Sequence, residues 1–286
     1  MKKDMFINAQ QEECRIAITS EGALAELYTE RASSASRVGN IYKGRVTNVE
    51  PSIQAAFVDF GTAKNGFLHI SDLSPTYFPK GQKGVETVGK KRSRRDRPPI
   101  QQCLRRGQEV TVQVTKDGIG TKGATLTTYI SLPGRYLVLM PGMHRLGVSR
   151  KIEDEEARTR MRNVLEQLKP PQDVGFILRT AGQDRPKRDL QRDMTYLARL
   201  WKSISKRNKE AKAPAEIYRE SDLVVRTIRD VYNSDIKRIV CDSEPVAQQI
   251  KEFFRVTMPR THNRVELYEG EIGLFHAFGL EQEIET

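Results

Sequence analysis

Short runs of alternating hydrophobic and polar positions dominate the chain between residues 38 and 70. Side chains at every second position of a strand share one face of a sheet. Three strands separated by turns are therefore expected at Ile41–Asn48, Ile53–Phe60 and Gly66–Ile70. Two more candidate strands, Gly107–Val114 and Gly123–Ile130, follow after a long connection.

Five short strands with a loop before the fourth match the oligonucleotide/oligosaccharide-binding (OB) barrel. Alternation gives these strands one small-aliphatic face, which suits the barrel interior. On the other face Phe57 lies beside Asp59, and Phe67 beside His69. Exposed aromatic rings on a curved antiparallel sheet can stack nucleic-acid bases. The pattern leaves open the alternative that both phenylalanines belong to the hydrophobic core.

The connection before the fourth strand carries a cluster of positive charge. Residues 77–99 hold eight basic side chains against Glu86 and Asp96, with no helical or strand period. Counterion release rewards clustered Lys and Arg, so we expect the loop at 80–99 to bind phosphates without sequence preference. The alternative is an inert, solvated insertion.

Residues 118–123, GIGTKG, match the glycine pattern of dinucleotide-binding loops. That pattern requires a strand before it and a helix after it, whereas the strand-like ATLTTYI follows here. We therefore interpret the segment as a hairpin turn from which Lys122 projects.

Beyond Leu132, strands and helices alternate, which predicts a mixed α/β region. Arg179 and Thr180 stand where one expected strand, Val174–Thr180, ends. A guanidinium beside a hydroxyl can hold a terminal phosphate, and a surface arginine next to a capping threonine is the alternative. The segment 216–286 can supply the partner strands that an N-terminal hairpin within residues 5–30 requires.

Composition narrows the choice of partners. The 286 residues indicate two or three domains, and 48 Lys and Arg against 37 Asp and Glu give a net charge of +11. This surplus favours nucleic acid or an anionic membrane surface. The longest apolar run is too short to span a membrane, and the first residues lack the apolar part of a secretion signal. Three cysteines without CxxC spacing predict reduced thiols, a cytoplasmic location and no metal site.

Taken in order, these segments resemble the ribonuclease E/G family of bacterial endoribonucleases. The matching residues are VGNIYKGRVTNVEPSIQAAFVDFG, NGFLHI, YFP, GQEVTVQV, KGATLTTYISLPGRYLVLMP, GVSRKIE, ILRTAG and ELYEGEIGLF. The resemblance implies a multidomain α+β fold. An S1-type OB barrel at 37–130 and a 5′-sensor α/β segment at 131–215 would be inserted into a discontinuous RNase H-like domain of residues 1–36 and 216–286.

The resemblance also implies two groups of site residues. The residues that correspond to RNA-contacting positions of the barrel are Phe57, Phe67 and Lys122. The residues that correspond to the pocket for a 5′-monophosphate are Gly134, Val138, Arg179 and Thr180, the first two through their backbone. The implied partner is single-stranded RNA, preferably with a 5′-monophosphate, since the family accommodates a triphosphate poorly.

In the family, a DNase I-like catalytic domain with magnesium-binding aspartates follows this region, and a later cysteine pair shares structural zinc between subunits. No residue here matches those ligands. The chain is therefore expected to have no catalytic residue, to bind no cofactor, to be inactive alone and to be monomeric. Two functions stay open: the RNA-binding, 5′-sensing part of an endoribonuclease of RNA processing and decay, or a stand-alone S1-domain RNA-binding adaptor.

Overall fold

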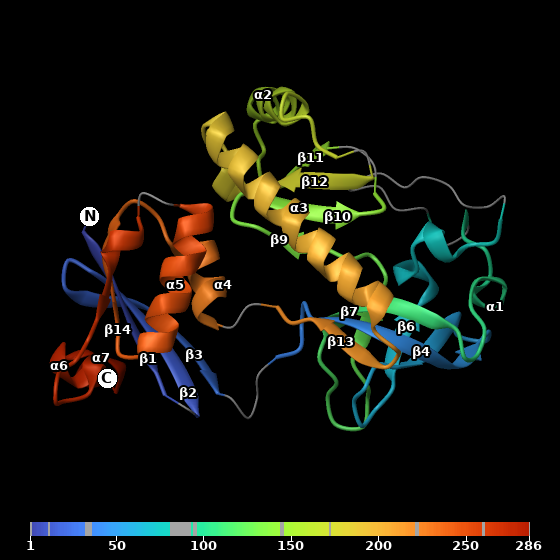
Figure 1. Ribbon diagram of the computed structural model, residues 1–286, viewed down its shortest axis with the longest axis horizontal. Coiled ribbons are helices and arrows are strands. Elements are labelled where there is room, and N and C mark those ends of the chain that lie inside the picture. Colours follow the sequence, from blue (N-terminus) through green and yellow to red (C-terminus); the bar gives the residue numbers. More distant parts are fainter. Residues whose placement is uncertain are drawn as a thin grey trace. The chain divides into compact units, whose positions relative to one another are not determined.

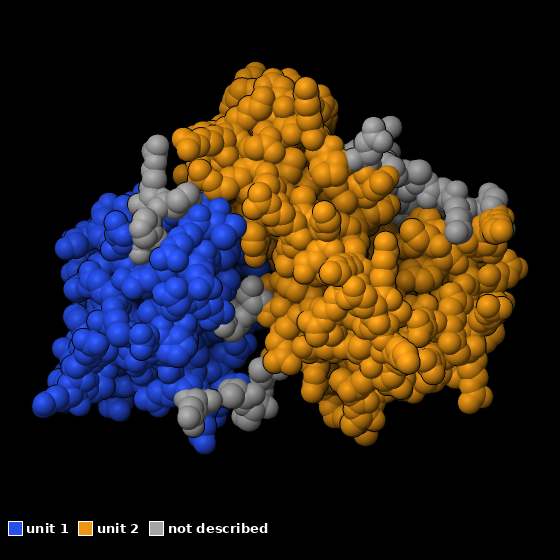
Figure 2. Space-filling model, viewed as in Figure 1, with its two compact units in different colours: residues 1–35, 221–286 blue, residues 36–220 orange. Residues whose placement is uncertain are grey.

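The two ends of the chain share one β-sheet, while the middle of the chain folds separately. The computed structural model describes residues 2–10, 12–31, 36–80, 93, 96–143, 146–171, 173–220, 223–258 and 261–285. Unit 1 contains residues 1–35 and 221–286, and unit 2 contains residues 36–220 (Figure 2).

Unit 1 is built, within the described residues, on five strands in the order β15–β14–β1–β2–β3 (Figure 1). These strands are β1 (Lys3–Ala9), β2 (Glu13–Ser20), β3 (Ala23–Arg31), β14 (Ile236–Cys241) and β15 (Val265–Leu267). β1 pairs in parallel with β14, while β2 pairs antiparallel with both β1 and β3. The N-terminal strands thus obtain their partners from the C-terminal segment, as the sequence indicated.

Helices cover both faces of this sheet because its strands alternate between two hydrophobic sets. The helices are α4 (Leu223–Val231), α5 (Glu244–Thr257), α6 (Leu274–Ala277) and α7 (Leu280–Ile284). Met5 and Ile7 belong to one buried cluster with α4 and α5. Phe6, on the opposite face of β1, packs with α6 and α7.

The first part of unit 2 is a closed β-barrel. Its strands are β4 (Ile41–Glu50), β5 (Ala55–Asp59), β6 (Gly66–His69), β7 (Glu109–Lys116) and β8 (Thr125–Thr127). They follow one another as β4–β5–β6–β8–β7, and pairing of β4 with β7 closes the barrel. Ala56, Val58 and Leu68 are completely buried in its core. The predicted barrel and its inward face are confirmed.

The second part of unit 2 is a sheet in the order β11–β12–β10–β9, with two helices. The elements are β9 (Leu132–Pro133), β10 (Leu137–Pro141), β11 (Leu146–Val148), β12 (Val174–Leu178), α2 (Glu155–Glu166) and α3 (Lys187–Glu210). Leu190 and Leu197 of α3 are buried with Phe176 of β12. The same cluster includes Ile41 of β4 and Ile217, so the core of the second sheet extends to one barrel strand, while the barrel interior forms a cluster of its own.

Strand β13 (Ala215–Tyr218) corrects one predicted boundary. The sequence assigned residues 216–220 to the C-terminal domain, yet β13 pairs antiparallel with β4 of the barrel. A four-residue strand carries too little pattern to select its partner. What decides its place is Ile217, which is only 2% exposed in the interior of unit 2.

Most of the basic loop predicted at 80–99 lies outside the described residues, and the short helix α1 (Ile100–Cys103) follows it. Its last cation, Arg97, is buried. The guanidinium donates to the carbonyls of Ile70 at 3.2 Å and Leu73 at 2.8 Å, and to the hydroxyl of Tyr129 at 3.0 Å. At this position the prediction of a phosphate-binding side chain is wrong, because Arg97 satisfies backbone carbonyls instead.

Candidate nucleic-acid interface

Phe57 and Phe67 lie next to each other on the barrel, outside its core. They are direct partners across β5 and β6, with ring centroids 6.1 Å apart in an edge-to-face arrangement. Both rings are half-buried, whereas the neighbouring Ala56 and Leu68 are completely buried. The geometry favours an aromatic surface over the core interpretation, and contact of these rings with RNA stays a prediction.

His69 extends this pair into a row of three rings, a role that the sequence analysis did not assign. Its ring is stacked on Phe67 at 6.4 Å with an interplanar angle of 19°. The Nδ1 atom accepts a hydrogen bond from the Ser71 backbone N–H at 3.2 Å, which fixes the ring. The available signal was its position two residues after Phe67, on the same face of β6.

Lys122 is exposed in the turn between β7 and β8. This turn packs against the segment that leads into β6. The Lys64 ammonium donates to the Gly120 carbonyl, and the Phe67 N–H donates to the Ala124 carbonyl at 2.8 Å. Strand β8 follows the glycine pattern where a nucleotide-binding loop requires a helix, so the hairpin interpretation is confirmed.

The four residues predicted to bind a 5′-phosphate gather at one end of the second sheet. Arg179 follows β12, and its Nη1 donates to the Gly134 carbonyl at 2.6 Å. The Arg179 backbone N–H donates to the Tyr136 carbonyl at 2.8 Å. Thr180 is exposed at the start of a 3₁₀ turn, and Val138 is half-buried on β10, paired with β12.

Asp193 of α3 supports the turn between β9 and β10, and the sequence analysis missed it. Its carboxylate accepts backbone N–H bonds from three consecutive residues: Arg135 at 3.2 Å, Tyr136 at 2.8 Å and Leu137 at 2.9 Å. A Cβ on Gly134 would lie 2.6 Å from an Asp193 oxygen, so this close approach requires glycine. Burial raises the pKa of the Asp193 carboxyl, while the three N–H donors and the Arg179 charge lower it.

The signal for Asp193 was a charged residue on the apolar face of a helix. It is 3% exposed and stands in α3 among the buried Leu190, Met194 and Leu197. A buried carboxylate there requires hydrogen-bond donors. The sequence alone does not show that the N–H donors to Asp193 belong to a turn that lies 56 to 58 residues earlier in the chain.

Metal-binding groups do not assemble in the part of the chain that the structure describes. Among the described residues, no group of three or more His, Cys, Asp or Glu side chains could hold a metal ion. Burial raises the pKa of the Cys103 and Cys241 thiols to about 11 each. Among the described helices, none is long and apolar enough to cross a membrane.

The closed five-stranded barrel is the fold expected of an S1-type domain. A model described as the S1 RNA binding domain matches residues 36–117, and one described as the ribonuclease E/G family matches residues 131–286. The chain belongs to the ribonuclease E/G family.

Curated relatives extend this similarity along the whole chain. Ribonuclease E of Haemophilus influenzae is 42% identical over 286 residues, which cover 99% of this chain and 29% of the relative. Ribonuclease E of Escherichia coli K12 is 39% identical, with 99% and 26% covered. Ribonuclease G of the same strain is 39% identical, with 100% and 57% covered. The chain thus spans between about a quarter and just over half the length of these relatives.

Replacing Phe57 by alanine is expected to weaken single-stranded RNA binding by about 1–3 kcal/mol, because one stacking surface is lost. Fluorescence anisotropy of a labelled oligonucleotide measures this change. Phe278→Ala serves as the control, since Phe278 is a partly exposed phenylalanine of unit 1. If Phe57→Ala does not fold, the result would favour the alternative that Phe57 belongs to the hydrophobic core.

Proposed function

We propose that this chain is the RNA-binding and 5′-monophosphate-sensing part of a ribonuclease E/G-type endoribonuclease that cleaves single-stranded RNA in RNA processing and decay. Two features of unit 2 support this proposal. The barrel carries a row of aromatic rings, and the second sheet carries the Arg179–Gly134 group. The relatives carry the names ribonuclease E and ribonuclease G. A cytoplasmic location accords with such a substrate.

The Arg179–Gly134 group suits a terminal phosphate for a physical reason. A guanidinium presents N–H donors in a rigid planar fork that matches phosphate oxygens. The bond to the Gly134 carbonyl orients this fork, and the Asp193 bonds hold the turn that carries this carbonyl. The Thr180 hydroxyl follows directly in the chain and supplies a further donor.

Arg179→Ala is expected to reduce the preference for 5′-monophosphate over 5′-hydroxyl RNA. A hydrogen bond to a charged group contributes about 1.5–3 kcal/mol, which corresponds to roughly tenfold or more in relative affinity. Anisotropy with two oligonucleotides that differ only at the 5′ end measures this ratio. Arg162→Ala, which removes an exposed charge from α2, should leave the ratio unchanged. Equal affinity of the unaltered chain for both ends would refute the sensor assignment.

A stand-alone S1-domain adaptor would share these binding properties. The two functions differ in whether the natural reading frame continues past Thr286 into an aspartate-bearing domain. Sequencing across that position separates them.

A further inference from the structure

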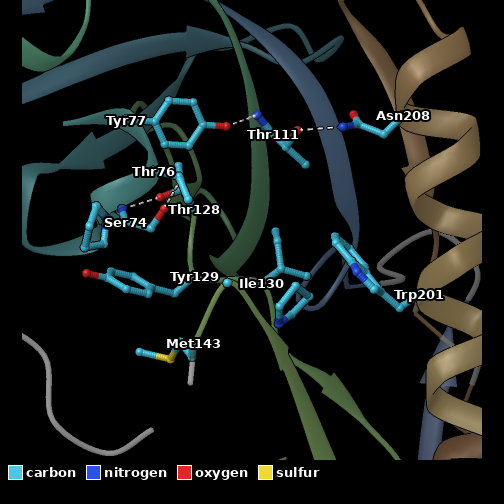
Figure 3. A pocket seen from close by; sticks show the side chains of 13 residues that line it. Ser74, Thr76, Tyr77, Thr111, Thr128, Tyr129, Ile130, Met143, Trp201 and Asn208 are labelled. Carbon is cyan, nitrogen blue, oxygen red and sulfur yellow. Dashed lines mark hydrogen bonds between the residues drawn. The ribbon is translucent and has the colours of Figure 1, made fainter. Parts of the chain in front are cut away.

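A cavity of about 200 Å³ lies within unit 2, and none of the site residues described above lines it (Figure 3). Tyr77 and Thr111 of the barrel region form one side. Trp201 and Asn208 extend from α3 on the other side, and Ile130 lies between Tyr129 and Trp201. The cavity therefore lies between the barrel and α3, the helix that also carries Asp193.

The lining indicates a neutral ligand. No described side chain around the cavity carries a charge at neutral pH, since the lining consists of hydroxyl, amide, thioether, aromatic and aliphatic groups. Burial raises the pKa of Tyr77, which keeps its phenol protonated. A phosphate, carboxylate or ammonium would lose its hydration here without a counter-charge.

One edge of the cavity holds an incomplete chain of hydrogen bonds. The Asn208 Nδ2 donates to the Thr111 hydroxyl at 2.9 Å, and the Thr111 backbone N–H donates to the Tyr77 oxygen at 3.0 Å (Figure 3). The Asn208 Oδ1 is buried and, among the described residues, accepts no hydrogen bond. Exchanging the two amide atoms would leave the other one unsatisfied, so in either orientation the chain of hydrogen bonds is incomplete behind the cavity wall.

Size and wall chemistry narrow the ligand to a single planar ring system. The volume of about 200 Å³ lies below the roughly 300–1,000 Å³ of sites for drug-sized ligands. Trp201 supplies an aromatic wall, and the Asn208–Thr111–Tyr77 edge supplies mixed donors and acceptors. RNA-binding proteins hold unstacked bases by this combination of aromatic contact and edge hydrogen bonds.

We propose that this cavity binds one unstacked nucleobase, supplied by an RNA strand bound to unit 2 or by a free nucleoside. The RNA source rests on the RNA binding proposed above, whereas the nucleoside source does not. The base edge would accept a hydrogen bond from the Tyr77 phenol, and the ring would contact Trp201.

Trp201 makes the proposal directly measurable, because it is the only tryptophan in the sequence. The 286-residue chain is titrated with the four nucleosides, with an RNA oligonucleotide and with an abasic oligonucleotide of equal length. We expect quenching of Trp201 fluorescence by nucleosides and by RNA, and none by the abasic strand. Asn208→Leu should raise the quenching midpoint roughly tenfold, the size of effect expected when a base loses its binding contacts.

Matched variants separate the cavity from general effects. Asn163→Leu makes the same change at an exposed site on α2 and should leave quenching unaltered. If Asn208→Leu does not fold, Asn208→Asp replaces it, because aspartate keeps the side-chain shape and places a charge on the same edge. This variant should also raise the quenching midpoint. Trp201→Phe retains an aromatic wall and should preserve RNA affinity, which Trp201→Leu should lower.

Each outcome decides the proposal. Quenching by nucleosides alone would exclude RNA as the source. RNA binding by anisotropy, without quenching by RNA or nucleosides, would overturn the cavity assignment and leave the proposed function intact. An absence of RNA binding would contradict the proposed function, and the nucleoside titration would then decide the cavity alone.

Discussion

Asp193→Asn is expected to lower the free energy of unfolding by about 1–3 kcal/mol, since a carboxamide has only one acceptor oxygen and at least one buried N–H of the turn therefore loses its acceptor. Two of the three N–H bonds converge on Oδ2, so the turn at 135–137 cannot keep them all. Because this turn carries the Gly134 carbonyl that orients Arg179, most of the preference for a 5′-monophosphate should disappear as well.

Urea denaturation measures the stability change, and the affinity ratio for the two RNA ends measures the positioning effect. Asp189→Asn is the matched control, because Asp189 lies on the surface of the same helix and pairs with Arg192 at 3.9 Å. Its expected effect is at most about 0.5 kcal/mol. A destabilised Asp193→Asn protein with an unchanged ratio would restrict Asp193 to a structural role. Unchanged stability would contradict the three-bond arrangement itself.

The barrel could be predicted from sequence because its signal is local. Alternation within a few residues places Ala56 and Val58 on the inward face and Phe57 on the opposite face, and the structure keeps this division. The hairpin after β7 was predictable for the same reason, since the segment after Gly123 has a strand pattern. Such features depend on neighbours along the chain.

The contacts that hold the site together could not be predicted, because they join distant positions. Arg179 contacts Gly134 across 45 residues, and Asn208 contacts Thr111 across 97. Residue type and spacing leave Arg179 open between a phosphate ligand and a surface residue, and only the family resemblance assigned it. The sequence marked Asp193 as a charged residue on an apolar helix face but did not show its partners, and it gave no signal for Asn208 or for the partner of β13.

The glycine pattern at 118–123 shows how similar residues can serve another purpose. In a dinucleotide-binding loop, glycine lets backbone approach phosphate. Here a Cβ on Gly123 would lie 1.9 Å from the carbonyl oxygen of Asn65, so the glycine lets one loop approach another. This contact holds the Lys122 turn against the segment that leads to Phe67.

Gly123→Ala is therefore expected to destabilise the barrel by about 3 kcal/mol or more, since overpacking against backbone that cannot rotate away costs at least as much as overpacking in a core. The turn must move away from Asn65, and RNA affinity should fall because Lys122 moves with it. Denaturation and anisotropy on the same preparation measure both effects.

Gly120→Ala in the same turn separates this contact from backbone strain. Gly120 has a φ of +57°, but a Cβ there would meet nothing within 4 Å. Only the left-handed conformation is penalised, by about 1–2 kcal/mol, and the approach of the turn to Asn65 is unaffected. If both variants lose the same stability and the same RNA affinity, backbone strain is sufficient to explain why glycine is required at both positions. A larger loss in Gly123→Ala assigns the effect to the contact, and makes the position of Lys122 a consequence of how closely two loops of the barrel can approach.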